Sequence, residues 1–304
     1  MTSADRTVVL DGGLSDALAE RGHRLGGQLW TARLLQEAPG EIAAAHRTYF
    51  DAGAEVATTA SYQASTEGFV HAGLSAVEAE RAIQRSVTLA REVRDAVDAE
   101  DPRDRPRLVA ASVGPYGAVL ADGSEYRGRY GVPAAALRAF HADRLELLAA
   151  AGPDLLAVET VPDLDEAAVL VDLLADLHAR TGLTAWFSYT VARGRTRAGQ
   201  PLDEAFALVA GCPAVIAVGI NCSDPAEVLP ALEQVGATGK PGVVYPNRGS
   251  GWDAVEHRWI DEPQIDVTVA RAWIDAGARF VGGCCQVGPA DIAALAAVVH
   301  PAAP

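Results

Sequence analysis

Cysteine is scarce in this sequence, with only four residues in 304, namely Cys212, Cys222, Cys284 and Cys285. So few thiols, gathered toward the C-terminus, exclude a fold held together by disulfides and favour metal binding or catalysis instead. Long apolar runs are also missing, since no stretch reaches the about eighteen residues of a membrane-spanning helix. The first residues, MTSADRTVVLDGG, lack the basic and apolar regions of a secretory signal. We therefore expect a cytoplasmic protein with no membrane partner.

Basic residues are outnumbered, because 25 Lys and Arg stand against 40 Asp and Glu, and the formal net charge is -15. No Lys- and Arg-rich block and no interleaved aromatic stripe offsets this charge locally, so the chain would repel the phosphate backbone of nucleic acids. An acidic surface instead favours small cationic molecules. We expect small-molecule substrates and no nucleic-acid partner, and the sequence carries no signal for the oligomeric state.

Eight short apolar runs recur along the whole chain, and segments with helical periodicity lie between them. The runs are continuous in β-branched and aliphatic residues, which is typical of a parallel sheet that helices cover on the outside. The runs occupy residues 7–10, 55–59, 107–112, 155–160, 184–189, 214–220, 242–245 and 279–283. The helical segments include residues 39–53, 74–97, 165–181, 225–236 and 289–299.

Strand and helix in alternation over 304 residues predict an α/β fold, namely a single closed (β/α)8 TIM barrel. A doubly wound open sheet is the alternative. No Pro/Ser-rich linker or low-complexity tract interrupts the pattern, and an apolar content of 49% is enough for a large core, so we expect one domain over residues 1–304. The longest segment without an apolar run, residues 113–131, is rich in Gly and Tyr, which is typical of a binding loop or a lid.

Polar residues follow the predicted strands at the point where each strand ends. In a (β/α)8 barrel these ends meet on one face, where active sites are built. The sequence therefore predicts one polar mouth to which most of the strands contribute. The clusters are Asp11-Gly12-Gly13, Ser61-Tyr62-Gln63, Gly114-Pro115-Tyr116, Glu159-Thr160, Asn221-Cys222-Ser223, Tyr245-Pro246-Asn247 and Gly283-Cys284-Cys285.

The adjacent Cys284 and Cys285 follow two glycines that allow the backbone a tight turn. Cys222 is far away in the sequence, but in a closed barrel the ends of the sixth and eighth strands face the same mouth. Three thiolates can then meet around one zinc ion whose fourth tetrahedral position stays open, as in catalytic sites. A vicinal disulfide, a redox pair and ordinary buried thiols are the alternatives. We expect Cys212, before the sixth strand, to be a small buried residue away from the mouth.

Eight motifs run in order over nearly the whole chain. They are LDGGL at 10–14, LW at 29–30, TASYQAS at 59–65, SVGPYGA at 112–118, ADGSEYRG at 121–128, GINCS at 219–223, VVYPN at 243–247 and GGCC at 282–285. Together they resemble the homocysteine S-methyltransferase family, and within it most of all the stand-alone bacterial and plant-type enzymes that use S-methylmethionine. The resemblance implies the barrel and a zinc ion held by three cysteines, which map to Cys222, Cys284 and Cys285.

The same resemblance implies how homocysteine is bound. Asp11 and Glu159 are the expected partners of its ammonium, and Glu159 joins the three cysteines in the expected catalytic set. Backbone N–H groups near Gly12 and Gly13 and around Ser61 would bind the carboxylate. Without the family, an Asp before two glycines is equally well a turn former, and Glu159 a strand-end acid with a structural role.

A sulfonium methyl donor can rest against aromatic faces, because the ring quadrupole attracts a cation by roughly 0.5 to 2 kcal/mol per contact. Tyr62, Tyr116, Tyr126 and Tyr130 stand in the strand-end motifs or in the long third loop, and we expect them near the donor. Core packing or loop anchoring is the alternative for each of them. Asn247, at the end of the seventh strand, completes the expected substrate-binding residues.

The resemblance implies a zinc-dependent methyl transfer from S-methylmethionine, with S-adenosylmethionine as a second donor, to the thiolate of L-homocysteine, giving methionine. A thiol is mostly protonated at neutral pH, and zinc releases its proton so that the thiolate can attack. The alternatives are a relative that uses selenocysteine or betaine, a zinc hydrolase, and a zinc or redox thiol sensor. The chain has no HExxH helix for a hydrolase, and a sensor would need no amino-acid pocket.

Two segments depart from this picture. The chain reads YPNRGSGWD, with Arg248 and Ser250 where the family usually has Ser and Glu. An added cation near the mouth bears on the methyl donor more than on the acceptor. The basic segment ARGRTR at 192–197 follows the fifth strand, and we interpret it as a solvated loop.

Overall fold

The computed structural model describes residues 6–23, 29–104, 106–249, 252–253, 258–259 and 268–301. Eight strands form one sheet in which all neighbours run parallel. Each strand coincides with one of the apolar runs, so all eight predicted strands are confirmed. The strands are β1 (Val8–Val9), β2 (Val56–Thr58), β3 (Leu108–Val113), β4 (Leu155–Val161), β5 (Ala185–Tyr189), β8 (Val215–Asn221), β9 (Gly242–Tyr245) and β12 (Ala278–Val281).

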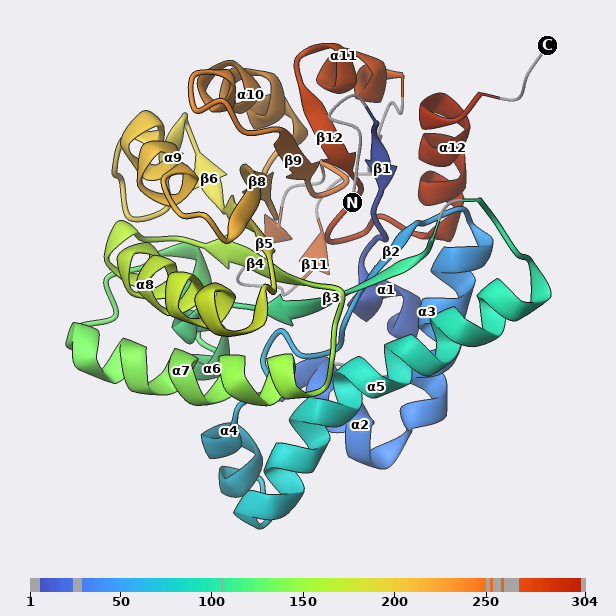
Figure 1. Cartoon of the computed structure of the whole chain (residues 1–304), viewed down its shortest axis with the longest axis vertical. Coiled ribbons are helices and arrows are strands. Elements are labelled where there is room, and N and C mark those ends of the chain that lie inside the picture. The colour runs from blue at the N-terminus through green and yellow to red at the C-terminus, as the bar shows by residue number, and fades with distance from the viewer. Residues whose placement is uncertain are drawn as a thin grey trace.

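The sheet closes on itself, which confirms the barrel and excludes the open doubly wound sheet. Its strand order is β1-β12-β9-β8-β5-β4-β3-β2. Strand β2 then returns to β1 through a parallel bridge between Leu10 and Val56, and the Glu55 N–H donates to the Val9 carbonyl over 2.7 Å. In Figure 1 the strands lie at the centre and the helices surround them.

Helices connect the strands, as parallel pairing requires, and they form the outer layer of the barrel. All five helical segments predicted from periodicity are present, although the segment 225–236 begins with a 3-10 turn. None of the described helices is long and apolar enough to cross a membrane. The helices are α1 (Leu14–Glu20), α2 (Leu34–Glu37), α3 (Pro39–Asp51), α4 (Thr66–His71), α5 (Ala76–Glu100), α6 (Tyr116–Leu120), α7 (Ala134–Ala150), α8 (Leu164–Thr181), α9 (Leu202–Ala210), α10 (Val228–Gly236), α11 (Val269–Asp275) and α12 (Pro289–Val299). The 3-10 turns are η1 (Trp30–Arg33), η2 (Ser124–Tyr126) and η3 (Pro225–Glu227).

Helix α5 illustrates how local sequence sets these elements. It begins with a capping box, in which the Ser75 side chain accepts from the Glu78 N–H and the Glu78 side chain accepts from the Ser75 N–H. Its buried residues recur at three- and four-residue spacing, so one face packs against the barrel while the other faces solvent. These buried residues are Ala79, Ala82, Ile83, Ser86, Val87, Leu89, Ala90 and Val97.

Side chains fill the interior of the barrel and form the floor of the space above it. Trp186 is fully buried there, and its Nε1–H donates to the Tyr245 hydroxyl over 2.9 Å. The Phe280 ring lies 6.0 Å from the Trp186 ring, measured between centroids. Because this plug closes the barrel below, substrates can approach only from the carboxyl ends of the strands.

Two antiparallel hairpins stand apart from the barrel sheet. Strand β6 (Val191–Ala192) pairs with β7 (Arg195–Thr196), and β10 (Trp252–Asp253) pairs with β11 (Arg258–Trp259). The long third segment, residues 113–131, is not a plain loop, because it carries α6 and η2. Both the first hairpin and this third segment lie at the carboxyl ends of their strands.

Candidate active site and metal centre

A pocket opens at the carboxyl ends of the barrel strands, where the sequence predicted a polar mouth. Its empty volume, which includes space open to solvent, is about 910 Å³. Three expected site residues, Ser61, Tyr116 and Asn247, are absent from its described lining. The other nine line it: Asp11, Gly12, Gly13, Tyr62, Tyr126, Glu159, Cys222, Cys284 and Cys285.

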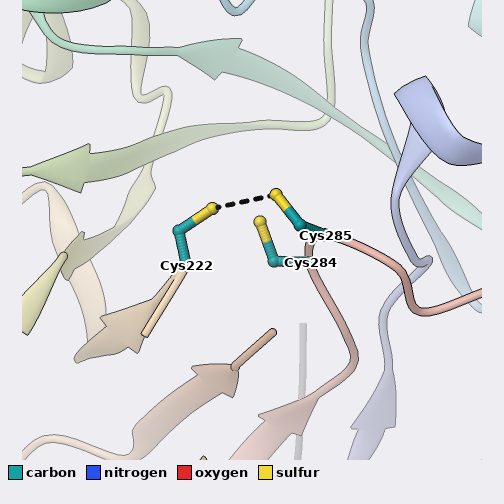
Figure 2. Close-up of side chains that lie close together, drawn as sticks. All are labelled: Cys222, Cys284 and Cys285. Carbon is teal, nitrogen blue, oxygen red and sulfur yellow. Dashed lines mark hydrogen bonds between the residues drawn. The ribbon is translucent and has the colours of Figure 1, made fainter. Parts of the chain in front are cut away.

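Three cysteines line this pocket, and Figure 2 shows that their sulfur atoms point toward one another. The Sγ atoms of Cys222 and Cys285 lie 3.7 Å apart, and the Sγ atoms of Cys222, Cys284 and Cys285 all lie within 4.8 Å of one another. Cys222 follows β8 in a left-handed backbone conformation with φ 48°, which residues with a side chain rarely adopt. The Thr190 hydroxyl holds this conformation by donating to the Cys222 carbonyl over 3.1 Å. Strained backbone of this kind is typical of functional sites.

The two glycines before the cysteine pair are needed for space. A Cβ on Gly282 would lie 2.6 Å from the Cβ of Leu10, and a Cβ on Gly283 would lie 2.1 Å from a methyl group of Val287. Both positions keep ordinary φ values, and the left-handed residue of this turn is Gln286, with φ 66°. The two glycines therefore allow the turn to pack closely against Leu10, which follows β1, and against Val287, which follows the turn.

The donor set fits a tetrahedral zinc ion. Zn–S bonds of about 2.3 Å at tetrahedral angles place neighbouring sulfurs about 3.8 Å apart, which matches the 3.7 Å between Cys222 and Cys285. Hydrogen bonds from the Cys284 and Cys285 thiols lower the pKa of Cys222, and the hydrogen bonds to Cys222 raise the pKa values of the other two. A cation between the three thiols would therefore favour the ionisation of all of them. Since all three line the pocket, an ion held there is accessible to a substrate.

Residues behind the cysteine turn hold it in position. The Asn247 Oδ1 accepts from the Cys285 N–H over 3.2 Å, and the Asn247 N–H donates to the Ser223 carbonyl over 2.9 Å. Asp16 in α1 accepts from the Gln286 N–H over 2.7 Å. Such partners orient metal ligands and affect metal affinity. These contacts support a positioning role for Asn247, which stands behind Cys285.

Asp11 and Glu159 bring two buried carboxyl groups to the pocket. Asp11 is 4% exposed and accepts from the Thr58 N–H over 2.7 Å and the Thr58 hydroxyl over 2.9 Å. Glu159 is 7% exposed and accepts from the Ser112 hydroxyl. Burial raises the pKa of each carboxyl to about 7, although these hydrogen bonds act in the opposite direction. Neither carboxyl forms an ion pair with a described residue, so both can receive a cationic group from a ligand.

The backbone expected to bind a carboxylate is partly engaged already. The Gly13 N–H donates to the Val287 carbonyl over 2.9 Å, and a Cβ on Gly12 would lie 2.2 Å from the same carbonyl oxygen. Ser61 is fully buried, and its hydroxyl donates to the Ser112 carbonyl over 2.8 Å. The side chain of Ser61 therefore supports the strand ends from behind the pocket wall.

The four tyrosines divide into two pairs. Tyr62 and Tyr126 line the pocket, and the Tyr126 hydroxyl lies 3.8 Å from the Cys222 Sγ. Tyr116 instead packs edge-on against the Phe140 ring of α7, with 5.2 Å between the centroids. Tyr130 donates to the Glu166 Oε2 in α8 over 2.9 Å. The second pair thus anchors the third segment, which was the alternative interpretation for these tyrosines.

The solvated loop predicted for residues 192–197 is wrong in part. Arg193 and Arg195 are exposed, but the segment forms the β6–β7 hairpin and Arg197 is half-buried. The Arg197 guanidinium lies over the Tyr126 ring, 5.6 Å from its centroid. The prediction failed here because Tyr126 comes from a distant segment, and its position was not readable from the basic run.

Arg248, one of the two departures from the family pattern, forms an ion pair. Its Nη2 lies 3.4 Å from the Asp291 Oδ1 at the start of α12, and its N–H donates to the Cys285 carbonyl over 3.0 Å. Arg248 is not among the described residues that line the pocket. The charge of Arg248 is therefore compensated by Asp291, outside the part of the pocket where the methyl donor is expected. Ser250, the second departure, lies outside the described residues.

Sequence reasoning assigned no role to three residues that contribute to the site, although it had placed Gln63 in the predicted polar mouth. Gln63 and Glu125 line the pocket, and both stand inside motifs already noted, TASYQAS and ADGSEYRG, so a signal was present. Arg144 in α7 is 1% exposed and donates to the carbonyls of Gly114 over 2.8 Å and Tyr62 over 2.6 Å. It ties together the loops after β2 and β3. No sequence signal marks it, because it lies in the middle of a helix.

Comparison with known proteins agrees with this site. A sequence model described as homocysteine S-methyltransferase matches residues 8–299. The chain is 45% identical over 295 residues to a homocysteine S-methyltransferase of Escherichia coli (strain K12), a match that covers 95% of this chain and 94% of that protein. It is 38% identical over 304 residues to a selenocysteine Se-methyltransferase of Brassica oleracea var. italica, with 95% and 87% covered.

A solved structure gives the same result at the level of the fold. The crystal structure of the homocysteine methyltransferase MmuM from Escherichia coli, in its metallated form, matches with a TM-score of 0.86 and 44% sequence identity, and the match covers 96% of each chain. Sequence and structure therefore agree over almost the whole length. The chain belongs to the homocysteine S-methyltransferase family.

Proposed function

We propose that this protein transfers a methyl group from S-methylmethionine to L-homocysteine, with Zn²⁺ held by Cys222, Cys284 and Cys285, and so forms methionine. The observation that carries the proposal is that this sulfur cluster and the buried carboxyl groups of Asp11 and Glu159 line one pocket. Membership of the homocysteine S-methyltransferase family supports the reaction. The metallated form of the related MmuM supports a metal at the site.

Zinc, when bound, supplies a Lewis acid that lowers the pKa of the homocysteine thiol and keeps its sulfur nucleophilic at neutral pH. The sulfur attacks the methyl carbon of the donor, a new bond between sulfur and methyl forms, and the bond from that carbon to the sulfonium sulfur breaks. The donor leaves as methionine, the acceptor becomes methionine, and the thiol proton goes to solvent. Opposite charges combine into neutral thioethers, so a site that excludes water and aligns the partners favours the step.

Residues of the chain would orient the acceptor. Asp11 and Glu159, whose pKa values lie at about 7, accept from the homocysteine ammonium, and its positive charge draws both carboxyls into the ionised form. The carboxylate of homocysteine lies toward the backbone near Gly12 and the loop after β2, since the Gly13 N–H is already used. When the ammonium and carboxylate of homocysteine are fixed in this way, its thiol can reach the three cysteines, because Asp11, Glu159 and the cysteines line the same pocket.

The methyl donor would lie toward the third segment. Tyr62 and Tyr126 line that part of the pocket, and the Tyr126 ring can attract a sulfonium on the face that Arg197 does not cover. The carboxylates and thiolates of the site add a negative field that favours a cationic donor. We also propose that residues 1–304 act as one domain in the cytoplasm, where reducing conditions keep thiol ligands available.

One assay tests the reaction and the donor together. The zinc-loaded protein is incubated with L-homocysteine and, separately, S-methylmethionine, S-adenosylmethionine or betaine, and the methionine formed is quantified. We expect the highest rate with S-methylmethionine, a lower rate with S-adenosylmethionine and no product with betaine. Removal of the metal with a chelator should abolish turnover, and added Zn²⁺ should restore it. Full activity in the metal-free protein would contradict the proposal.

Selenocysteine is a second candidate acceptor, because a relative that is 38% identical bears the name selenocysteine Se-methyltransferase. A selenolate is softer than a thiolate and suits the same ion. Competition between equal concentrations of homocysteine and selenocysteine for a limiting amount of S-methylmethionine gives the ratio of the two kcat/KM values directly. We expect homocysteine to be preferred, and a ratio in favour of selenocysteine would reassign the acceptor.

A further inference from the structure

Two oxygen atoms in the pocket wall lack a hydrogen-bond partner among the residues that the structure describes. They are the Oε1 of Gln63, in the loop after β2, and the Oε2 of Glu125, in η2. Both side chains line the same pocket as the sulfur cluster. A buried acceptor without a donor is unfavourable, so its retention in a pocket points to a ligand that completes it.

The orientation of the Gln63 amide follows from its other contact. Gln63 is 3% exposed, and its Nε2 donates to the Ala118 carbonyl over 2.7 Å. A carbonyl only accepts, so the amide nitrogen must face Ala118 and the amide oxygen must face away from it. The buried side chain thus holds one fixed acceptor that no residue in the described part of the chain uses.

Helix α6 brings Gln63 and Glu125 to the same wall. Gln63 is bonded to the carbonyl of Ala118 in this helix. Glu125 lies against Gly117 of the same helix, since a Cβ on Gly117 would come within 2.6 Å of the Glu125 nitrogen. Tyr126 follows Glu125 directly, and its hydroxyl is 3.8 Å from a sulfur of the cluster. The wall with the two acceptors therefore stands next to the reacting centre.

The cations close to Glu125 are engaged elsewhere. Arg127 pairs with Asp122 over 3.3 Å, and Arg197 lies over the Tyr126 ring. In the described ranges of the chain no ion pair to Glu125 is formed. Burial raises the pKa of Glu125 and outweighs the opposing charge of Arg127.

Two side chains that line one pocket and each hold an acceptor without a donor match a group that only donates, and an α-ammonium is such a group. Asp11 and Glu159 come from other strand ends, after β1 and in β4, and are already assigned to homocysteine. The second amino-acid substrate brings a second ammonium. We propose that Gln63 and Glu125 bind the α-ammonium of the sulfonium methyl donor. This inference rests on the proposed function and deepens it, because it defines the donor as an amino acid.

The subsite would select donors by their N–H groups. S-methylmethionine carries its ammonium a short carbon chain away from its sulfonium, so one molecule can span Glu125 and Tyr126. Betaine has a quaternary nitrogen without N–H, so it would leave both acceptors unsatisfied. A sulfonium without an amino group would have the same defect. Donor preference is therefore expected to follow the ammonium as well as the sulfonium.

The test compares two donors in two variants. (3-Carboxypropyl)dimethylsulfonium keeps the sulfonium and the carboxylate of S-methylmethionine but lacks its amino group. Loss of one charge-assisted hydrogen bond in E125Q should raise the KM for S-methylmethionine by about tenfold or more, and it should leave the KM for the desamino donor unchanged. E67Q is the matched control, because Glu67 is exposed in α4, outside the pocket, and loses the same charge. It should change neither KM.

Each further result has a defined meaning. The KM for homocysteine and the zinc content should be the same in E125Q as in the wild type, and E125D should recover part of the donor affinity. An equal rise in KM for both donors would overturn the inference in favour of a structural role for the loop, and a rise for homocysteine alone would move Glu125 to the acceptor. If the wild type makes no methionine with any sulfonium, the proposed function itself fails. If the wild type forms methionine but the ratio of the KM values for S-methylmethionine and the desamino donor is the same in E125Q as in the wild type, only the inference is overturned.

The second residue of the subsite is tested by Q63M, which keeps the length of the side chain and removes its acceptor. It should also raise the KM for S-methylmethionine and not the KM for the desamino donor. Thermal unfolding of Q63M checks the fold, since the bond to the Ala118 carbonyl is lost as well. If Q63M is folded and its ratio of KM values for the two donors equals that of the wild type, Gln63 is not part of the subsite.

Discussion

Glu55 and Glu159 are buried carboxyl groups at opposite ends of the barrel, and their pKa values are shifted in opposite directions. Glu55 lies before β2, at the amino ends of the strands, and is 6% exposed. It forms an ion pair with Arg6, and it is bonded to the His300 Nε2 and the Val9 N–H, each over 3.0 Å. Glu159 lies at the carboxyl ends, is 7% exposed, and forms no ion pair with a described residue.

The exposed fractions of Glu55 and Glu159 are similar, and their hydrogen-bond and charge partners differ most. Burial by itself would raise the pKa of both groups, and it is the largest effect on each. At Glu55 the hydrogen bonds from His300 and Val9 and the charge of Arg6 outweigh it, so the pKa is lowered. At Glu159 burial prevails, and the pKa rises to about 7. At the closed end Arg6 pairs with the buried carboxyl of Glu55, whereas no described cation pairs with Glu159 at the open end.

The largest expected effect is loss of the sulfur cluster at the open end. C222S should lose bound zinc and lower kcat/KM for methyl transfer on the order of a thousandfold, since a Lewis acid contributes several kcal/mol to such a step. Metal analysis and the methionine assay measure the two losses. C212A is the matched control, because Cys212 is buried away from the cluster and contacts the Val171 carbonyl. A fully active, zinc-free C222S would remove the metal from the mechanism.

Substitution of Glu159 should affect binding and not folding. E159Q should raise the KM for homocysteine by about tenfold to a hundredfold, because a charged hydrogen bond to the ammonium is lost. The free energy of unfolding above pH 7 should stay the same or increase, because an ionised buried carboxyl is removed. Steady-state kinetics and urea unfolding provide both values. A clear loss of stability with an unchanged KM would show that Glu159 has a structural role.

Substitution of Glu55 should give the reverse result. E55Q should lower the free energy of unfolding by about 1 to 3 kcal/mol, because charge-assisted bonds to buried partners are weakened. The KM for homocysteine and the zinc content should not change, since Glu55 lies at the opposite end of the barrel. The same urea and kinetic measurements check this pair of expectations. An effect of E55Q on KM larger than its effect on stability would break the comparison between the two ends.

The last difference between the two ends lies in the pH dependence of stability. The folded protein holds protons on Asp11 and Glu159 up to about pH 7, whereas the unfolded chain releases them near their ordinary values of 3.8 and 4.5. Between those pH values the folded state binds more protons, so these two groups make stability fall as pH rises and have no further effect above about pH 7. The D11N/E159Q double variant should lack this decrease of stability with pH. The measurement is the difference in the free energy of unfolding in urea between wild type and variant at a series of pH values.

Glu55 should contribute with the opposite sign. Its pKa is lowered in the folded protein, so its stabilisation is present above the ordinary value of 4.5 and is lost as pH falls through the folded pKa. The stability difference between wild type and E55Q should therefore shrink in acid. A difference that stays constant down to low pH would mean that the carboxylate charge is not what stabilises this end.

The barrel was predictable because its eight strands are buried on both faces and therefore read as uninterrupted apolar runs. The β6–β7 hairpin and the short helix α6 were not predicted, because elements of so few residues are set by tertiary contacts such as that of Arg197 with Tyr126. Bounds shifted by one to three residues where caps decide them, as at Ser75, the N-cap of α5.

The cluster of three cysteines was also predictable, because barrel topology alone brings the ends of the sixth and eighth strands to one face. The side-chain contacts of the site residues could not be predicted from the sequence. Whether Tyr116 contacts a ligand or packs on Phe140 depends on the direction of one side chain, which no motif encodes. The unused acceptors of Gln63 and Glu125 become visible only when the neighbours of each atom are known.

The positions of the three cysteines along the chain determine when the proposed metal site can form. Cys222 directly follows β8, and the other two sulfurs follow β12, the strand that pairs with both β9 and β1 and completes the ring. A nascent chain on the ribosome therefore cannot capture the ion before residue 285 has emerged and β12 has inserted. The free energy of ion capture is added to this last insertion. Uptake of the ion should thus follow completion of the ring, and chains truncated before β12 should leave the cellular zinc pool untouched.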